Sequence, residues 1–305
     1  MGSGGFIGRN LVETLLCDPD VTVTGFGRTA RNTNKNVQFI EGNIEDSTIL
    51  ARALRNQDII YHLISQTIPS SSWDNPLLEI DNNLQPSIKL IELAAAAGVQ
   101  KICFASSGGT VYGLNDSVLN EDSPTDPFSP YGIIKRTIES FLEYARHRYG
   151  VNYDIYRISN AYGEGQDISK GLGFINTILE NIVNGRPVVV YGNGENVRDF
   201  IHVVDVGKLL ARSVSLNLGA SNIFNISSNN PISLNDLLAL MKQVTSVDFE
   251  IQYRANRLND NKKVILDNSK IMKLNGGVSL ISLKDGVEKT YNYLQKRATY
   301  VEKSI

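Results

Sequence analysis

Short apolar runs and longer helical patterns alternate along the first half of the chain. The runs predict strands at residues 21–26, 37–40, 58–64, 101–105 and 153–158. Apolar residues at helical spacing predict helices at residues 6–16, 47–54, 82–97 and 131–149. Because such alternation is typical of parallel strands joined by crossover helices, we expect an α/β fold with a doubly wound parallel sheet.

The pattern loosens after residue 163. Helices are predicted at 172–184 and 205–215 and a strand at 187–191, whereas residues 229–305 contain short elements and Asn-rich loops. We therefore expect two units. The larger contains residues 1–163 and about 197–228, and a smaller, mixed lobe contains about 164–196 and 229–305.

The composition is that of an ordinary globular protein. The 305 residues are 42 % hydrophobic and 20 % charged, with a formal net charge of −2. This balance does not favour binding to nucleic acid or to an anionic membrane. No apolar stretch approaches the roughly 18 residues of a membrane span. No signal peptide is recognisable either, so we expect a cytoplasmic protein.

Cysteine and histidine are rare in the chain. Cys17 and Cys103 lie in apolar segments, which predicts buried free thiols in a reducing compartment rather than a disulfide. The histidines are scattered without the spacing of metal ligands, so we expect no metal; they are His62, His147 and His202.

Glycines open the chain at three-residue spacing. Ahead of a helix, Gly2, Gly5 and Gly8 let backbone amides approach a pyrophosphate at the helix N-terminus. Such a loop normally follows the central strand of the sheet, yet only Met1 precedes it. We therefore expect a sheet without its first strand, through truncation or a start assigned too late. The alternative interpretation of the opening is a disordered Gly/Ser tail.

Tyr131 and Lys135 are four residues apart in a predicted helix and therefore share a face. An ammonium group beside a phenol favours the phenolate, so we expect Lys135 to lower the pKa of Tyr131 and make it usable for acid/base chemistry. A nearby serine hydroxyl can complete a proton relay to a substrate alcohol. By itself this spacing is common in helices and does not identify a site.

Three motifs in combination resemble a known family: the glycine opening, the stretch SSGGTVYG at residues 106–113, and the Tyr131/Lys135 pair. They are similar to the extended short-chain dehydrogenases/reductases of the NAD-dependent epimerase/dehydratase family, and most of all to nucleotide-sugar epimerases of the UDP-glucose 4-epimerase type. The resemblance runs from Gly2 to about Leu294. It implies a Rossmann-like dinucleotide-binding domain in the larger unit, a nucleotide-sugar-binding lobe in the smaller one, and NAD as cofactor.

The resemblance implies a cofactor site along the strand ends. The glycine loop would bind the pyrophosphate, the stretch GNI at 42–44 matches a segment that contacts adenine, and HLIS at 62–65 matches His-Leu-Ala-Ala beneath the ribose. An asparagine further on would lie near the nicotinamide. The cofactor residues so implied are Gly2, Gly5, Phe6, Ile7, Gly8, Asn43, Ile44, Leu63, Ile64 and Asn83, with Tyr131 and Lys135.

The second strand departs from the pattern of NAD-dependent members. Gly25 stands where that pattern has an acidic residue that binds the adenosine ribose, and Arg28 follows shortly after. A guanidinium there can pair with a 2′-phosphate. NADP therefore becomes an alternative to NAD, with Arg28 as a candidate cofactor residue, unless Arg28 is a solvated surface arginine.

The resemblance also implies the catalytic and substrate residues. Catalysis is expected from Ser107, Tyr131 and Lys135, with Ser106 and Thr110 as alternatives for the serine hydroxyl. The sugar is expected to contact Ser107, Tyr131 and Gly108. Motifs at residues 156–163, 198–202 and 257–260 imply a clamp for the nucleotide diphosphate and ribose, made of Asn160, Arg198, Arg257 and Asp260.

These residues predict a nucleotide-sugar 4-epimerase that oxidises sugar C4 transiently through NAD, with Tyr131 as acid and base. Gly109 and Thr110 stand where 4,6-dehydratases carry an acidic pair, which argues against dehydration. Two alternatives stay open: an NADP-dependent nucleotide-sugar 4-ketoreductase, and a non-catalytic or truncated dinucleotide-binding protein. The expected substrate is UDP-linked. Relatives usually form homodimers through a four-helix bundle, which here would use helices 82–97 and 131–149.

Overall fold

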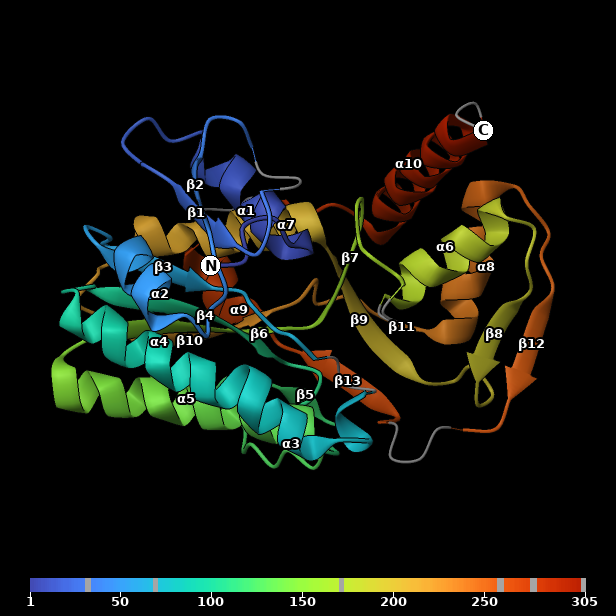
Figure 1. The fold of residues 1–305 in the computed structure, drawn as a ribbon. Coiled ribbons are helices and arrows are strands. Elements are labelled where there is room, and N and C mark those ends of the chain that lie inside the picture. The colour runs from blue at the N-terminus through green and yellow to red at the C-terminus, as the bar shows by residue number, and fades with distance from the viewer. Residues whose placement is uncertain (31–33, 68–70, 170–172, 257–260, 275–278, 303–305) are drawn as a thin grey trace.

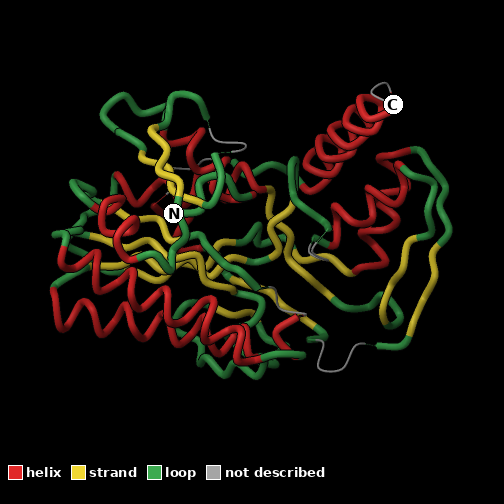
Figure 2. The backbone as a smooth tube through the Cα atoms, viewed as in Figure 1, coloured by secondary structure: helices red, strands yellow, loops and turns green. Residues whose placement is uncertain are grey.

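The computed structural model describes residues 1–305 except 31–33, 68–70, 170–172, 257–260, 275–278 and 303–305. It has two lobes: a parallel sheet with helices on both faces, and a smaller group of helices and strands beside it (Figure 1, Figure 2). The blue and green parts of the chain build most of the larger lobe, and the smaller lobe contains mainly yellow to red segments (Figure 1).

The central sheet of the larger lobe has the strand order β10-β6-β4-β3, and every neighbouring pair is parallel. A second parallel pair, β1-β2, accompanies it. The bounds of these strands are β1 Thr24–Gly27, β2 Gln38–Glu41, β3 Ile59–His62, β4 Lys101–Ser107, β6 Asn152–Ile158 and β10 Asn222–Ile226. The predicted doubly wound parallel arrangement is confirmed.

Helices cover both faces of this sheet. On one face, apolar residues of α2, α4 and α5 share a buried cluster with β3, β4 and β6. On the other face, α1, α7 and α9 share a cluster with β6 and β10, and α1 packs against α7. The bounds are α1 Phe6–Leu15, α2 Ser47–Leu54, α4 Gln85–Ala96, α5 Pro130–Tyr149, α7 Val203–Ala211 and α9 Ser269–Leu274.

The first residues of the chain lie between β1 and β3. The amino group of Met1 donates a hydrogen bond to the carbonyl of Tyr61 (2.8 Å), and Leu63 donates to the carbonyl of Met1 (3.2 Å). On the other side, Gly2 donates to the carbonyl of Phe26 in β1 (2.8 Å). Within the described ranges no strand pairs β1 with β3, so the sheet is in two parts.

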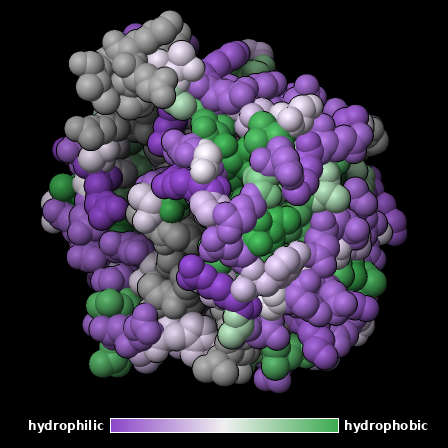
Figure 3. Space-filling view, turned by 90° about the vertical axis from the view of Figure 1, so that its right-hand side faces the viewer, coloured by the Kyte–Doolittle hydropathy of each residue, from purple (hydrophilic) through white to green (hydrophobic). Residues whose placement is uncertain are grey.

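The smaller lobe has its own buried cluster. Helices α6, α8 and α10 pack together around it, and the parallel strands β8 and β12 flank them. The outer face of this lobe is mostly hydrophilic around an apolar centre (Figure 3). The bounds are α6 Phe174–Val183, α8 Leu234–Thr245, α10 Leu283–Glu302, β8 Val188–Tyr191 and β12 Ile251–Arg254.

A small mixed group of strands around β9 lies between the two lobes (Figure 1). β9 pairs in parallel with β7 and β13 and antiparallel with β11, and β13 also pairs with β5. The bounds are β5 Val118–Leu119, β7 Asn160–Tyr162, β9 Val197–His202, β11 Pro231–Ser233 and β13 Lys263–Leu266. After β13 the chain returns to the larger lobe, because α9 packs against β10.

Several predicted elements have different ends. The predicted helix 82–97 is preceded by α3 (Pro76–Glu79) and begins with a π-helical segment, η2 (Ile80–Leu84), before α4. The predicted helix 205–215 is α7 followed by the 3-10 turn η3 (Arg212–Val214). A further 3-10 turn, η1 (Ser71–Trp73), stands before α3.

The two cysteines differ in burial. Cys103 is buried in β4, as predicted, but Cys17 is exposed, so the prediction of a buried thiol is wrong there. The reason is that α1 and its buried face end at Leu15, so Cys17 lies beyond them. None of the helices in the described ranges combines the length and apolar character needed to cross a bilayer.

Candidate active site

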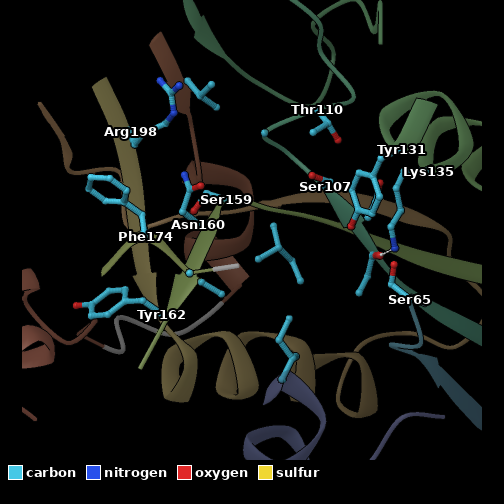
Figure 4. Close-up of a pocket in the computed structure, with 18 of the residues that line it drawn as sticks. Ser65, Ser107, Thr110, Tyr131, Lys135, Ser159, Asn160, Tyr162, Phe174 and Arg198 are labelled. Carbon is cyan, nitrogen blue, oxygen red and sulfur yellow. Dashed lines mark hydrogen bonds between the residues drawn. The ribbon is translucent and has the colours of Figure 1, made fainter. Parts of the chain in front are cut away.

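A cavity of about 920 Å³ opens between the lobes, beside the carboxyl ends of β4 and β6 (Figure 4). Residues of α1, α5, β4 and the loop after β3 line one part of it, and residues of α6, β7 and β9 line another. This is the edge at which open α/β sheets bind ligands. The predicted site residues that it brings together are Phe6, Ile7, Leu63, Ser107, Tyr131, Lys135, Asn160 and Arg198.

Tyr131 and Lys135 lie on the first turns of α5 and point toward the cavity (Figure 4). Ser129 fixes the start of this helix, because its hydroxyl accepts a 3.1 Å hydrogen bond from the amide of Gly132. Lys135 is only 6 % exposed, and its Nζ donates to the carbonyl of Ala105 (2.9 Å). The same Nζ is 5.5 Å from the centroid of the Tyr131 ring, so the predicted shared face is confirmed.

The pKa values of this pair correct one expectation. Burial raises the pKa of Tyr131 to about 12, although a hydrogen bond with Ser65 lowers it, and the Glu79 carboxylate raises it further. Burial lowers the pKa of Lys135 to about 8, against the opposing effect of Glu79 and Glu139. The expectation of a lowered pKa for Tyr131 is wrong for this structure, because desolvation of the phenolate dominates.

The hydroxyls after β4 have separate roles. Ser106 is buried, and its Oγ donates to Glu139 (2.5 Å), so its hydrogen is already used within the core. Ser107 lines the cavity beside Tyr131 (Figure 4). Thr110 also lines it, and its buried Oγ1 has no hydrogen-bond partner among the described residues. The geometry therefore favours Ser107 for the reacting hydroxyl, with Thr110 as a second hydroxyl in reach of a ligand.

The structure places Gly109, rather than Gly108, at the cavity. A Cβ at Gly108 would lie 2.2 Å from the Leu266 side chain and 3.0 Å from the carbonyl oxygen of Arg157. At Gly109 a Cβ would meet nothing within 4 Å. Gly108 is thus required by packing, and the sugar contact predicted for it is better assigned to its neighbour.

The glycine loop forms a cradle at the N-terminus of α1. A Cβ at Gly8 would lie 2.1 Å from the carbonyl oxygen of Gly2, and Gly2 itself has a φ of +81°. Gly5 is the N-cap residue, so no side chain satisfies the first amides of the helix. Free amides at a positive helix end, with no room for side chains, fit the pyrophosphate of a dinucleotide.

The loop after β3 supplies the adjoining wall. Leu63 lines the cavity, and Ile64 lies against the glycine loop, 3.2 Å from where a Cβ on Gly2 would be. Asn83 is buried and does not line the cavity. Its side chain holds the loop instead, through hydrogen bonds with Gln66, Thr67 and Glu79.

The candidates for the adenosine end lie beyond β1 and β2. Asn43 is exposed, and its amide donates to the Glu45 carboxylate (3.2 Å). Ile44 packs in the core cluster, so only its backbone can reach a ligand. Arg28 is exposed directly after β1.

The strand end at which the resemblance implies an acidic residue is Gly27 rather than Gly25 in the structure. β1 ends at Gly27, where a Cβ would have its nearest neighbour 3.7 Å away. Gly25 is buried within the strand, where a Cβ would lie 2.8 Å from Ser3 and 3.0 Å from Phe39. The prediction for Gly25 is therefore wrong, although the departure itself stands, since Gly27 is not acidic and Arg28 follows at once.

Asn160 and Arg198 lie across the cavity from α5 (Figure 4). The Asn160 amide donates to the carbonyl of Asp199 (2.9 Å), which orients its oxygen. Arg198, in β9, donates to the carbonyl of the residue before it (2.9 Å). The other two predicted clamp residues, Arg257 and Asp260, lie outside the described residues.

Residues in and behind the cavity wall that were not predicted include Ser65, Trp73, Phe128 and Glu79. Ser65 lies in the quoted stretch HLIS, and Trp73 is the only tryptophan of the chain, so both had a sequence signal. Trp73 and Phe128 line the cavity with ring centroids 6.1 Å apart. Glu79 is only 1 % exposed. Its burial could not be predicted from the local sequence, because it depends on the packing of α3 against α5.

Comparisons with known proteins agree with this geometry. The model of the NAD dependent epimerase/dehydratase family matches residues 1–227. UDP-glucose 4-epimerase of Mycolicibacterium smegmatis is 28 % identical over 308 residues, which cover 97 % of this chain and 98 % of that protein. UDP-glucose 4-epimerase of Thermotoga maritima, solved with UDP-glucose, has a TM-score of 0.91 and 31 % identity, covering 97 % of this chain and 98 % of that one.

The solved UDP-glucose 4-epimerase of Thermus thermophilus, a complex with NAD, has a TM-score of 0.89 and 27 % identity, covering 96 % of this chain and 97 % of that one. The likeness therefore spans both lobes, and the family model covers the whole of α5 and the glycine loop. On these grounds the chain belongs to the NAD dependent epimerase/dehydratase family.

Proposed function

We propose that this chain is a nucleotide-sugar 4-epimerase that acts with NAD. The observation that carries the proposal is one cavity lined by Ser107, Tyr131 and Lys135 and, opposite them, by Asn160 and Arg198. A hydroxyl, a phenol and an ammonium suit proton transfer at an alcohol, whereas a guanidinium and an amide suit a diphosphate. Solved relatives hold UDP-glucose and NAD, which supports a UDP-linked sugar as substrate.

In this proposal Tyr131 takes the proton of the sugar C4 hydroxyl and later returns it, with Ser107 bridging the two oxygens. Lys135 stays charged below its pKa of about 8 and attracts the phenolate. Because burial raises the pKa of Tyr131 to about 12, positive charge in the site is what makes it a base near neutral pH.

When bound, NAD accepts a hydride from C4 and gives it back, which inverts C4 if the sugar has turned in between. The cradle at Gly2, Gly5 and Gly8 would hold its pyrophosphate, with Phe6 and Ile7 beside it. Further toward the adenosine, the backbone of Asn43 and Ile44 would contact adenine. Leu63, Ile64 and Lys135 would contact the riboses.

The substrate diphosphate would be held by Arg198 and Asn160, together with Arg257 and Asp260. The 4-keto sugar is free to rotate about its link to a diphosphate that stays fixed. By holding the diphosphate, Arg198 and Asn160 would let the sugar present either face of C4 to the cofactor. In this proposal the larger lobe binds the cofactor, and the nucleotide end of the substrate lies toward the smaller lobe.

A nucleotide-sugar 4-ketoreductase that uses NADPH is the second candidate. It is favoured by the end of β1, where Gly27 offers no carboxylate to a ribose hydroxyl and the exposed Arg28 follows. Binding of NAD and NADP to the purified chain and to Arg28→Ala separates the two. The reductase requires tighter NADP binding that this substitution abolishes, and the epimerase requires tighter NAD binding that it leaves unchanged.

We also infer a cytoplasmic homodimer that buries α4 and α5, which run side by side along one edge of the larger lobe (Figure 1). α5 exposes large side chains on its outer face, namely Ile133 (45 %), Tyr144 (49 %) and Tyr149 (43 %). Apolar side chains of this size on a helix that already buries another face support an interface between copies.

The proposed activity is tested by incubating the purified chain and NAD with UDP-glucose, UDP-N-acetylglucosamine or UDP-glucuronic acid and resolving the products by anion-exchange chromatography. We expect conversion of at least one of them to an equilibrium mixture with its C4 epimer. Failure to convert any of them, combined with NADPH-dependent reduction of a 4-keto nucleotide sugar, would establish the second candidate instead.

A further inference from the structure

Trp73 and Phe128 form an aromatic wall of the cavity that the proposed chemistry does not use. Their ring centroids are 6.1 Å apart, the ring planes are tilted by 41°, and both residues line the cavity. Trp73 ends the 3-10 turn η1 and is 46 % exposed, so a large part of its side chain is open to a ligand or to solvent. Aromatic side chains on a cavity wall are typical of ligand-binding pockets.

The aromatic wall lies at the α5 side of the cavity. Phe128 is three residues before Tyr131, and Ser129 between them fixes the start of α5 through its hydrogen bond with the amide of Gly132 (3.1 Å). The turn η1 in turn lies against α5. Because Arg198 lies across the cavity (Figure 4), a sugar with C4 at Tyr131 and its diphosphate at Arg198 has the wall at its end farthest from the diphosphate.

The shape of a hexose decides which group meets the wall. C1 carries the diphosphate and C4 lies opposite it across the ring, so the C6 group, attached to C5 beside C4, projects at the Tyr131 end. When the ring turns about its link to the diphosphate, the C3 edge takes the place of C6. Two aromatic rings offer mainly carbon surface, with the indole N–H of Trp73 as the single donor, so they can contact either edge without fixing one orientation.

The charges around the aromatic wall do not favour an anion. Among the described residues that line the cavity, the cations are Lys135 and Arg198. The first is hydrogen-bonded to a carbonyl of β4 (2.9 Å), and the second lies on the opposite side (Figure 4). The charged residues nearest to the two rings along the chain are acidic and exposed, namely Asp74 and Asp126. A carboxylate at C6 would therefore lose water against these rings without a cation to pair with, which is costly.

We propose that Trp73 and Phe128 contact the C6 group of the sugar and select a nucleotide sugar in which this group is uncharged. The proposal deepens the proposed function and rests on it for the orientation of the sugar. A hydroxymethyl or methyl group meets carbon surface at the aromatic wall, whereas a uronic acid brings a carboxylate to it. UDP-glucose and UDP-N-acetylglucosamine are therefore favoured over UDP-glucuronic acid.

The first measurement uses the fact that Trp73 is the only tryptophan of the chain, so tryptophan emission reports on the aromatic wall alone. In protein saturated with NAD, we expect UDP-glucose to change this emission saturably and by more than saturating UDP, which lacks the sugar. Free tryptophan at the same ligand concentrations corrects for absorption by uridine. Equal changes with the two ligands, in protein that calorimetry shows to bind both, would overturn the inference.

The second measurement compares the Kd values of UDP-glucose and UDP-glucuronic acid by calorimetry. We expect the unsubstituted chain to bind the uronic acid at least about tenfold more weakly, because its carboxylate is left unpaired. Trp73→Arg supplies the missing cation and should reduce this ratio to about twofold or less. Tyr293→Arg adds the same charge at an exposed aromatic residue of α10 and should leave the ratio unchanged.

Equal affinity of the unsubstituted chain for the two sugars would contradict the selection of an uncharged C6 group. So would a ratio in Trp73→Arg that equals the ratio in the unsubstituted chain, in protein that still binds UDP. If the chain binds these nucleotide sugars but converts none of them, the proposed function fails, yet the emission and the Kd values still decide the role of the aromatic wall. Binding of neither sugar would contradict both proposals.

Discussion

Removal of one oxygen from Tyr131 isolates its chemical role, because Tyr131→Phe keeps the ring that packs in the cavity. We expect this variant to lose about 10²- to 10⁴-fold in kcat, the range for a lost general acid or base, with bound NAD unchanged. Tyr144→Phe, an exposed tyrosine of the same helix, serves as the matched control and should keep full activity. Activity within a factor of two in Tyr131→Phe would refute the assignment.

Lys135 makes activity and stability depend on pH in opposite directions. Its pKa falls from 10.5 to about 8 in the folded chain, so the ammonium that supports Tyr131 is lost as pH rises through 8. We expect kcat/KM to fall above about pH 8. The unfolded chain binds more protons between pH 8 and 10.5, so the contribution of Lys135 to the free energy of unfolding rises with pH there.

The matched measurement compares thermal unfolding of the chain and of Lys135→Met at pH 8 and pH 10. The melting temperature of the unsubstituted chain minus that of Lys135→Met should increase from pH 8 to pH 10, because the buried ammonium becomes neutral. A constant difference across this range would show that Lys135 is not the group with the lowered pKa.

At the scale of elements, the proposed cofactor cradle consists of the glycine loop and the N-terminus of α1. Gly8→Ala places a Cβ 2.1 Å from the carbonyl oxygen of Gly2, so the loop must move away from the helix end. We expect NAD binding to weaken at least tenfold, measured by calorimetry. Gly219→Ala, at a surface turn without such a clash, should bind NAD normally.

The elements that the sequence predicted best have local causes. α5 begins and ends within one residue of its prediction, because Ser129 caps one end and Gly150, with a φ of +75°, ends the other. The π-helical segment η2 was not predicted; its Asn83 bonds the amide of Gln66, 17 residues earlier, a contact that the local pattern does not show. The end of β1 differs by one residue from its prediction, and Gly25 lies inside the strand, where Ser3 and Phe39 pack against it.

At the scale of the molecule, the cavity depends on contacts that no local pattern reveals. Motifs identified Tyr131 and Arg198, but only the return of β9 from the smaller lobe brings them to one cavity. The role of Glu79 could not be predicted, because its burial arises from the packing of separate helices. The resemblance thus identified candidate residues of the site, and the structure showed which other residues contact them.

The assembly can be tested on the outer face of α5. Tyr144→Glu should convert a dimer to a monomer in sedimentation velocity, because it places a charge in the proposed apolar interface. Leu274→Glu, an equally exposed apolar residue of α9, is the control and should leave the assembly unchanged. A monomer before any substitution would contradict the dimer.

The central claim is that C4 is inverted by removal and return of the same hydride. NMR of the product formed from UDP-glucose labelled with deuterium at C4 tests it most directly, or the labelled form of whichever sugar the chain converts. We predict that the C4 epimer retains the deuterium in ordinary water, since the label stays on the enzyme between the two steps. Inversion with loss of the label to solvent would contradict the account.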